Sequence, residues 1–438
     1  MTTTELNRAL LEGARNLTQV LPHLVSLREQ PFVFAVDIGL PALPLEPGVI
    51  LIRGPRQYGK STWLERQLLE TVERFGRGSA LYLNGDEVLS TGDFADRLRA
   101  LAASYAPDAP VRRLFIDEIT TIPDWQQALK AAIDRGEMRR VLVITTGSRA
   151  TDLRRGTERL PGRRGKLART TYLFTPISFA EFRRVCGTAL GAGALHAYMA
   201  AGGSPPACAA IAHHGRLPEY VPEMIRDWVY GETAASGRQR ASVAAVIRHL
   251  VRLGGSPVGQ AKLAREAGLA NNTIAAGFVE LLADLMCVGI AHAWDASRRV
   301  ALTRKPAKFP FLNLLAAVAW HPSQPRSAAD IESLLAGPEQ GAWWEWLAAQ
   351  ELWRRAALRG EEFPEHLHFW QGGEHEIDFV VAPNRFLEVK RGSSGPMEFA
   401  WFPRVFPKGR LTVITRTPFE TDHVQGITME DFLLAPAE

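Results

Sequence analysis

The stretch GPRQYGKS at residues 54–61 decides how the surrounding chain folds. It fits the pattern G-x-x-x-x-G-K-[ST] at every position, and it lies between an apolar run, 49–52, and a helical pattern, 62–69. In a strand, loop and helix of this kind, glycines let backbone N–H groups turn toward a phosphate, and the helix start adds its dipole. The stretch therefore predicts a phosphate-binding loop; the alternative is a plain glycine-rich turn.

The loop also indicates the cofactors, which we expect to be ATP and Mg²⁺. The ammonium of Lys60 is expected to reach the β- and γ-phosphates, and the hydroxyl of Ser61 is expected to ligate Mg²⁺. The residues expected to contact the nucleotide are Gly54, Pro55, Arg56, Gln57, Tyr58, Gly59, Lys60, Ser61 and Thr62.

A pair of acids follows a second apolar run. The sequence LFIDE at residues 114–118 predicts a strand that ends in Asp117 and Glu118. Ligands gather at the carboxyl ends of strands in open α/β sheets. We expect Asp117 to hold Mg²⁺ and Glu118 to polarise the attacking water as a catalytic residue. Taken alone, the pair would favour the alternative of two solvated acids at a strand end.

Further catalytic candidates lie after the apolar run 141–144. Ser148 or Thr146 is placed to sense the γ-phosphate, or else to cap a helix with its hydroxyl. Residues 149–169 then hold eight basic side chains against two acidic ones. Within this segment, Arg163 or Arg164 is a candidate arginine finger for a neighbouring subunit, with nucleic-acid binding or simple solvation as alternatives.

Length and composition favour a multidomain α/β protein. The 438 residues suffice for two or three cores, and no apolar run approaches the ~18 residues of a membrane span. Three scattered cysteines indicate a reducing, cytoplasmic setting rather than a disulfide framework. Apolar runs alternating with helical patterns predict a parallel sheet covered on both faces. The expected strands are 49–52, 80–83, 114–116, 141–144 and 171–174.

The predicted domains follow this pattern along the chain. We expect an N-terminal helix over 1–30, a P-loop ATPase domain over 31–177 and a helical lid over 178–240. A winged helix over 241–315, a linker over 316–340 and a small α/β domain over 341–438 follow.

The winged helix is expected to touch nucleic acid through its wing. Its third helix, capped by Asn272 or Thr273, carries no Lys or Arg, which argues against base reading. The wing side is basic and suits phosphate contacts, although a purely architectural winged helix stays an alternative. The candidate contacts are Arg298, Arg299, Arg304, Lys305 and Lys308.

The last region contains a second chemical pattern. Asp378 and Glu388 lie on consecutive predicted strands, and Lys390 shares a face with Glu388 because side chains two apart point the same way. Together with Glu345 of the preceding helix, the carboxylates could hold Mg²⁺, and Lys390 could orient a water. The alternative is a surface hairpin with one ion pair.

These motifs resemble the bacterial and archaeal AAA-type ATPases of the GPRQxGKT type. The resemblance rests on 54–62, 115–119, 122–125, 146–148, 160–163, 176–182 and 202–205. It implies a C-terminal winged helix followed by a restriction-endonuclease-like domain similar to PD-(D/E)XK nucleases, matched by 341–352, 375–379 and 387–390. It also implies a sensor role for Ser148, a finger role for Arg163 and a nuclease set of Glu345, Asp378, Glu388 and Lys390.

The function expected from the sequence is ATP hydrolysis coupled to DNA. The partner would be branched or ended DNA, bound through its backbone, and a finger acting between subunits would require a homo-oligomer such as a hexameric ring. No membrane association is expected. A nucleotide-gated signalling or defence switch with a C-terminal protein scaffold is one alternative, and an ATP-regulated metal-dependent nuclease is another.

Overall fold

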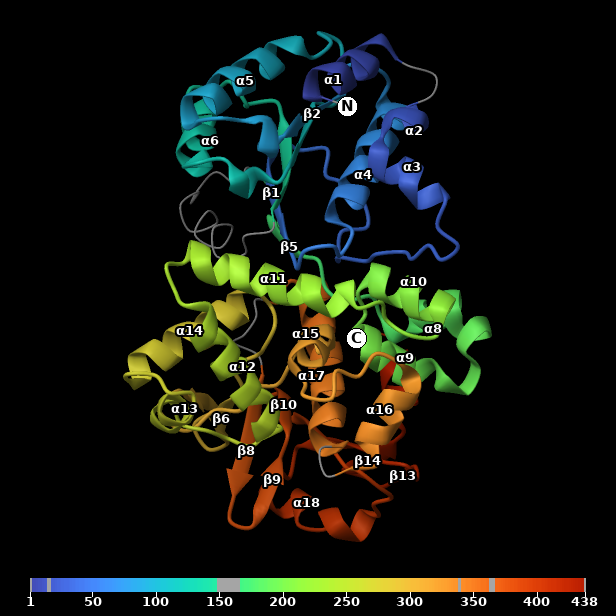
Figure 1. Cartoon of the computed structure of the whole chain (residues 1–438), viewed down its shortest axis with the longest axis vertical. Helices are drawn as coiled ribbons and strands as arrows, with labels where there is room; N and C mark the ends of the chain where they lie inside the picture. The colour runs from blue at the N-terminus through green and yellow to red at the C-terminus, as the bar shows by residue number, and fades with distance from the viewer. Residues whose placement is uncertain (1, 14–16, 148–165, 338–339, 362–366, 437–438) are drawn as a thin grey trace. The chain divides into compact units, whose positions relative to one another are not determined.

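The computed structural model describes residues 2–13, 17–147, 166–337, 340–361 and 367–436. The chain divides into two compact units, Met1–Thr175 and Pro176–Glu438 (Figure 1). The elements of the first unit are α1 (Thr3–Glu12), α2 (Leu17–Val20), α3 (Pro22–Arg28), β1 (Gly48–Arg53), α4 (Lys60–Phe75), β2 (Ala80–Asn84), α5 (Thr91–Ser104), β3 (Arg113–Asp117), α6 (Trp125–Asp134), β4 (Leu142–Gly147) and β5 (Thr171–Leu173).

The first unit is built on a parallel five-stranded sheet in the order β2-β3-β4-β1-β5. Each strand begins and ends within three residues of its predicted run, so the predicted parallel sheet is confirmed. The strand β1 lies between β4 and β5 and runs into the phosphate loop. The carboxyl ends of β1, β4 and β3 therefore lie side by side at one edge of the sheet.

Alternation along each strand explains why both faces are covered. Val49 and Leu51 of β1 pack in one cluster with apolar residues of α5 and α6. Ile50 and Ile52 point the other way, into a cluster with α1 to α4. Side chains of successive strand residues leave on opposite faces, so an uninterrupted apolar run fills both layers.

The N-terminal segment differs from the prediction of one helix over residues 1–30. Its described residues, 2–13 and 17–30, form three helices, because Gly13 ends α1 in the left-handed region (φ 70°) and Pro22 occupies the first turn of α3. These helices are also not a separate domain, since Leu6, Leu10 and Leu24 belong to the core of the sheet.

The helix α1 also covers the free edge of β2. The side-chain amide of Asn7 donates to the carbonyl of Tyr82 and accepts from its N–H, both at 2.8 Å. The hydroxyl of Thr3 accepts from the N–H of Asn84 at 3.0 Å. An edge strand exposes unpaired backbone groups, and here side chains of a helix satisfy them.

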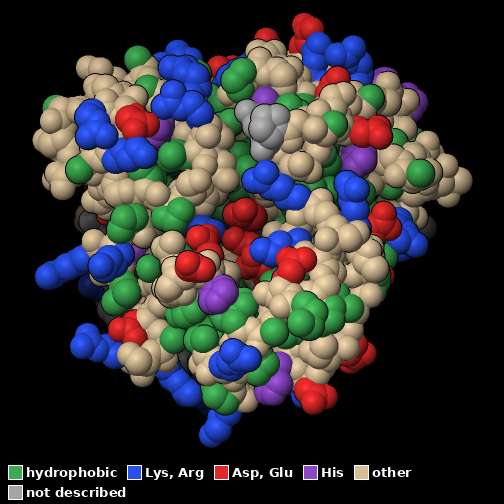
Figure 2. All heavy atoms as spheres, turned by 90° about the horizontal axis from the view of Figure 1, so that it is seen from below, with side chains coloured by type: hydrophobic (Ala, Val, Ile, Leu, Met, Phe, Trp, Pro, Cys, Tyr) green, Lys and Arg blue, Asp and Glu red, His purple; other side chains and the backbone are tan. Residues whose placement is uncertain are grey.

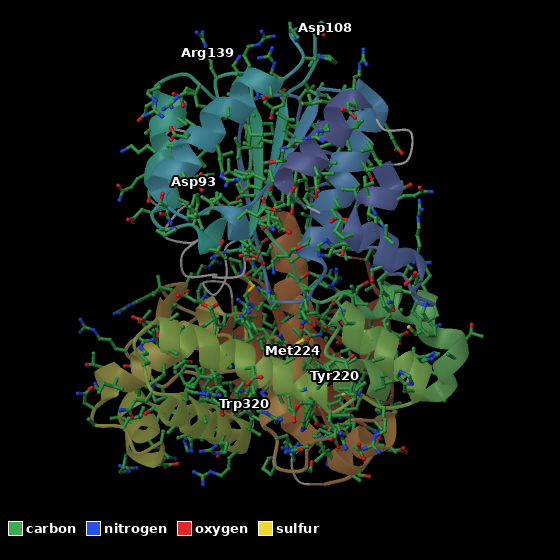
Figure 3. The ribbon with its side chains drawn as sticks, turned by 45° about the horizontal axis from the view of Figure 1, so that its top comes forward. Asp93, Asp108, Arg139, Tyr220, Met224 and Trp320 are labelled. Atoms are coloured by element: carbon green, nitrogen blue, oxygen red, sulfur yellow. The ribbon has the colours of Figure 1, made fainter. Side chains whose placement is uncertain are left out.

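The second unit begins with a layer of helices and ends with sheets. Figure 3 labels Tyr220 and Met224 on α11 and Trp320 at the end of α15. Its elements are α8 (Phe179–Leu190), α9 (Ala194–Ala201), α10 (Pro205–His214), α11 (Tyr220–Ala235), α12 (Arg240–Leu253), α13 (Gln260–Glu266), α14 (Asn272–Asp284), β6 (His292–Asp295), β7 (Val300–Leu302), α15 (Leu314–Trp320), α16 (Ala328–Leu335), α17 (Gln340–Arg359), β8 (His368–Gly372), β9 (His375–Ile377), β10 (Phe379–Ala382), β11 (Arg385–Val389), α18 (Phe402–Val405), β12 (Arg410–Ile414), β13 (Phe419–Glu420), β14 (Val424–Ile427) and α19 (Met429–Leu434).

The expected linker over 316–340 is not a linker in the structure. It contains most of α15, every residue of which is buried, and all of α16. Trp320 meets Tyr230 of α11 edge-on, with ring centroids 5.9 Å apart. Pro322 and Pro325 lie in the short turn between α15 and α16. Residues 176–438 form one compact unit, within which the predicted linker contributes packed helices.

The winged-helix segment contains the three expected helices and the expected hairpin. Asn271, rather than Asn272 or Thr273, caps the third helix, because its side chain accepts from the N–H of Ile274. The hairpin β6–β7 is antiparallel, but β6 also pairs with β8 in a sheet of order β7-β6-β8-β9. The wing is thereby joined to the C-terminal region.

The C-terminal region holds a mixed sheet of order β10-β11-β12-β14-β13. The inner pairs β11–β12 and β12–β14 are parallel, and the outer pairs are antiparallel. The strand β11 has both faces buried, so Glu388 lies inside rather than on a solvated face. Within the described residues, every helix is too short or too polar to cross a membrane.

Candidate functional site

The phosphate loop leaves β1 through a glycine that the packing requires. A Cβ at position 54 would lie 2.4 Å from the Cβ of Phe174, which follows β5. Further along, Gln57 and Gly59 have positive φ values of 60° and 89°, and α4 begins at Lys60. The turn that these angles produce leads the chain directly from the strand into the first N–H groups of the helix.

Lys60 is held inside this loop. Its ammonium donates to the carbonyls of Gly54 at 3.1 Å and Pro55 at 2.8 Å, and the side chain is buried. Burial lowers the pKa of Lys60 to about 8, although the carboxylates of Glu118 and Asp117 act in the opposite direction. The charges of Asp117 and Glu118 thus act on the Lys60 ammonium.

The two acids lie at the end of β3, against the end of β4. The hydroxyl of Thr146 donates to Oδ1 of Asp117 in a short hydrogen bond and accepts from the N–H of Glu118 at 3.2 Å. The N–H of Glu118 also reaches Oδ1 of Asp117 at 3.2 Å. Thr146 therefore links both acids and is fully buried.

Glu118 has an unusual backbone conformation that its neighbours maintain. Its φ of 48° is in the left-handed region, which is uncommon for a glutamate and costs free energy. Its carbonyl accepts from the N–H of Thr121 at 3.0 Å and from the Thr121 hydroxyl at 2.8 Å. On its other side, a Cβ at Gly85 would lie 2.4 Å from the same carbonyl oxygen. The sequence analysis did not identify Gly85 or Thr121 as supports of Glu118. The signal for Gly85 was the Asn-Gly-Asp turn at residues 84–86, which follows a predicted strand.

The oxygen donors at this site fit Mg²⁺. The hydroxyl of Ser61 and the carboxylate of Asp117 are hard ligands, and Mg²⁺ usually combines one or two carboxylates with nucleotide phosphates. Within the part of the chain that the structure describes, no group of three His, Cys, Asp or Glu side chains is arranged to hold a metal ion. Ser148, Arg163 and Arg164 lie outside the described residues.

A second group of charges lies in the C-terminal unit. The ammonium of Lys308 is 2.5 Å from Oε1 of Glu376, 3.0 Å from Oδ1 of Asp378 and 3.8 Å from Oε2 of Glu345. Lys308 was expected on the exposed wing side, but it is buried. Figure 2, a view from below, shows Asp and Glu side chains gathered near the centre of that face, with Lys and Arg side chains beside them.

The predicted nuclease residues are brought together around Asp378. Its N–H donates to Oε2 of Glu388 at 3.2 Å, and its own Oδ2 accepts from the N–H of Val389 at 2.9 Å. Lys390 pairs with Oε1 of Glu388 at 2.7 Å, as the shared strand face implied. Burial and then the charge of Asp378 raise the pKa of Glu345 to about 8 and that of Glu388 to about 7.

This arrangement does not fit a divalent cation as it stands. Both oxygens of Asp378 already have partners, and an ammonium occupies the space between the carboxylates. The remaining predicted nucleic-acid residues, Arg298, Arg299, Arg304 and Lys305, are exposed on and after the hairpin β6–β7.

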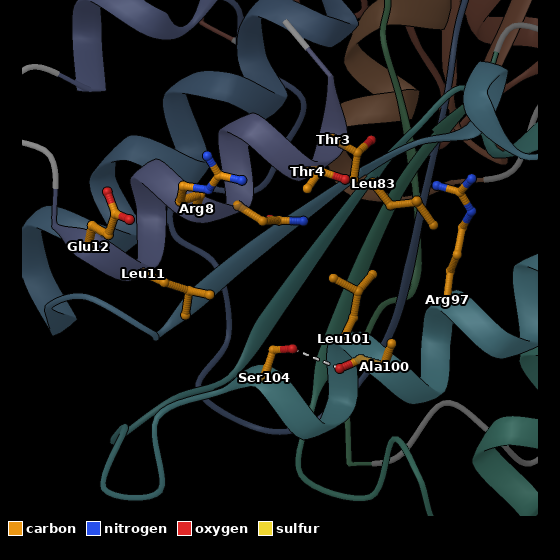
Figure 4. A pocket seen from close by; sticks show the side chains of 11 residues that line it. Thr3, Thr4, Arg8, Leu11, Glu12, Leu83, Arg97, Ala100, Leu101 and Ser104 are labelled. Atoms are coloured by element: carbon orange, nitrogen blue, oxygen red, sulfur yellow. Dashed lines mark hydrogen bonds between the residues drawn. The ribbon is translucent and has the colours of Figure 1, made fainter.

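A cavity of about 510 Å³ lies between α1, β2 and α5 (Figure 4). Apolar side chains such as Leu11 and Leu83 line it together with Arg8 and Arg97. None of the residues predicted to act on the nucleotide lines this cavity, so it is separate from the phosphate loop.

Residues 46–183 match a family model that is described as an AAA domain. No curated protein matches the chain.

Similar solved structures include a Walker-type ATPase of Pyrococcus abyssi, with 11% identity over 69% of this chain and 94% of that one, at a TM-score of 0.44. The ORC2 protein of Aeropyrum pernix in ADPNP–ADP complexes has 13% identity over 66% and 89%, at a TM-score of 0.38. At these identities and scores the likeness carries no argument about function. The family match, by contrast, covers the phosphate loop, both acids and Thr146.

Proposed function

We propose that this protein binds ATP with Mg²⁺ at the phosphate loop and hydrolyses it. One observation carries the proposal: Thr146 links Asp117 to Glu118 at the carboxyl ends of β4 and β3, beside the strand that leads into the loop. A phosphate cradle and a positioned acid pair at one edge of a parallel sheet are the parts that phosphoryl transfer to water requires.

Each residue has a role that follows from its chemistry. The backbone N–H groups of the loop and the Lys60 ammonium bind the phosphates, for which Lys60 exchanges its present carbonyl partners for phosphate oxygens. Ser61 and Asp117 would hold Mg²⁺, which supplies charge neutralisation between the β- and γ-phosphates. Glu118 orients and polarises the attacking water. Ser148 as sensor and Arg163 as finger complete the proposal.

The direct test is a pair of substitutions. Lys60→Ala should abolish nucleotide binding because it removes the ammonium proposed to bind the β- and γ-phosphates, and Glu118→Gln should keep binding but lose turnover. Fluorescent-nucleotide titration and phosphate release measure the two effects separately. Turnover at the wild-type rate in either variant would refute the assignment.

We further propose that ATP turnover is coupled to DNA. The exposed basic residues around β6–β7 support backbone contacts, which need charge but no base-reading helix. The C-terminal region then contributes a DNA-binding surface, and the working form is a homo-oligomer. The ATPase rate should rise when linear, single-stranded or four-way-junction DNA is added.

The alternatives give different outcomes in that same assay. A rate indifferent to every DNA would favour the nucleotide-gated switch with a protein scaffold. Strand cleavage that is lost in Asp378→Ala and kept in Lys60→Ala would favour the ATP-regulated nuclease. The ammonium among the carboxylates weighs against that second alternative.

A further inference from the structure

The strongest unexplained feature of the C-terminal unit is a lysine inserted from one region into the acidic cluster of another. Lys308 follows the hairpin β6–β7, whereas Glu345 lies on α17 and Glu376 and Asp378 lie at β9 and its end. The Lys308 side chain is 7% exposed, so its charge is nearly removed from water. A buried ammonium is tolerated only when carboxylates and hydrogen bonds compensate for the lost hydration.

The backbone holds Lys308 in this position from both sides. Its N–H and carbonyl each pair with Ala291 at 2.9 Å, and the preceding Ala307 pairs in the same way with Val258. The ammonium also lies 5.4 Å from the ring centroid of Phe369. Two antiparallel backbone bridges therefore fix the backbone from which the Lys308 side chain extends.

The carboxylates are fixed as well. Gly255 (φ 89°) stands against Glu345, where an added Cβ would lie 2.6 Å from Oε2. The two oxygens of Asp378 are taken by Lys308 and by the N–H of Val389. Glu388 is engaged by Lys390 and by the N–H of Asp378. A divalent cation would need oxygens that are already in use and would meet an ammonium in its place.

We propose that the ammonium of Lys308 is the resident cation of the cluster Glu345, Glu376 and Asp378, and that it excludes divalent metal from this site. The charge that a metal would supply is provided by the chain itself, from outside the predicted nuclease domain. It follows that the second unit can fold with this cluster buried and without a bound metal. It also follows that removing Lys308 converts the cluster into a metal-binding site.

The experiment uses full-length protein without nucleotide and Mn²⁺ as the probe. Binding is followed by electron paramagnetic resonance, and melting temperature is measured in EDTA and in Mn²⁺. Lys308→Met keeps the apolar stem and removes the charge. It should gain one Mn²⁺ site and melt lower than wild type in EDTA by roughly 5–15 °C, because three carboxylates lose their counter-ion. Mn²⁺ should restore much of that loss.

Two controls make the result specific. Adding Asp378→Asn to Lys308→Met should remove the gained site, which distinguishes it from any binding near the phosphate loop. Lys308→Arg keeps the charge and should show no gain. A wild-type protein with an Mn²⁺ site that Asp378→Asn abolishes would overturn the proposal, and so would a Lys308→Met variant that binds no Mn²⁺ or melts like wild type in EDTA. If Lys308→Met does not fold, Mn²⁺ binding to the wild-type protein still tests the proposal, which expects no site that Asp378→Asn abolishes.

Discussion

At the scale of single residues, Glu118 shows how neighbours determine a catalytic position. A glutamate at the end of an apolar strand could point anywhere, but this one is held in a left-handed conformation by Thr121 on its carbonyl and Thr146 on its N–H. Gly85 completes the support because it leaves room for that carbonyl. The strained conformation is therefore maintained by Thr146 of β4 and by the short helical turns that follow β2 and β3.

Gly85→Ala should reduce ATP turnover while leaving nucleotide binding nearly unchanged. The added methyl group would lie 2.4 Å from the Glu118 carbonyl oxygen and must displace it. Displacement by about 1 Å is enough to lower a rate by roughly 100-fold. Steady-state phosphate release and nucleotide titration measure the two effects.

The matched control is Gly92→Ala, in the first turn of α5, where an added Cβ meets its nearest atom, Oγ of Ser90, at 3.8 Å. It should behave like wild type. Equal turnover in both alanine variants would contradict the proposed support of Glu118.

The lowered pKa of Lys60 predicts how nucleotide affinity depends on pH. The free folded protein loses the Lys60 proton near pH 8, whereas the ordinary pKa of a lysine is 10.5. Between these values the unfolded chain binds more protons, so the free energy of unfolding rises with pH in that window. Only the ammonium form attracts phosphates, so the apparent Kd for ATP should be flat below about pH 8.

Above pH 8 that Kd should rise by up to tenfold per pH unit. A terminal phosphate with a pKa of about 6 is already ionised there and does not confound the measurement. Lys60→Met should bind weakly with no such slope. A pH-independent Kd up to pH 10 in the wild type would show that burial does not lower the Lys60 pKa.

At the scale of elements, the local sequence specified whether each segment is a helix or a strand. Packing specified which other element it pairs with or packs against. The helix α1 has a capping box and an apolar stripe, which the sequence shows, but its role in covering the edge of β2 depends on contacts 75 residues away. Similarly, the wing hairpin is visible as two short runs, yet its pairing with β8 joins segments about 76 residues apart.

Asn7→Ala should lower the free energy of unfolding by about 1–3 kcal/mol, because it leaves the N–H and carbonyl of Tyr82 without their partners. Denaturant unfolding with an intrinsic-fluorescence probe measures the change. Thr4→Ala on the exposed side of the same helix is the control and should stay within about 0.5 kcal/mol of wild type. A similar small change for Asn7→Ala would mean that water satisfies the edge of β2.

At the scale of the whole molecule, the basic hairpin should govern the salt dependence of DNA binding. Arg298→Ala combined with Arg299→Ala should weaken binding to every duplex to the same degree. It should also lower the slope of log K against log salt by about 2, since each lost phosphate contact removes about 0.9. Fluorescence anisotropy over a series of salt concentrations measures this slope.

The control for that experiment is Arg183→Ala with Arg184→Ala, an equal change of charge on exposed residues of α8 in the same unit. Its slope should equal that of the wild type. If both double variants lower the slope equally, the effect is one of net charge and the hairpin is not the contact surface.

By itself, the sequence determined the parts of this protein that depend on neighbours along the chain. The phosphate loop is one continuous stretch, and the five parallel strands are apolar runs whose type follows from local pattern, so both were predictable. The predicted linker and the exposed Lys308 were wrong because the burial of α15 and the pairing of Lys308 depend on packing. The single N-terminal helix was wrong for a local reason, because Gly13 ends α1 and Pro22 starts α3. Only the tertiary structure decided that Thr146 bridges the acids and that Lys308 lies among Glu345, Glu376 and Asp378. Such contacts join residues that are far apart in sequence. No periodicity or spacing in the sequence specifies which buried cation will pair with which buried carboxylate.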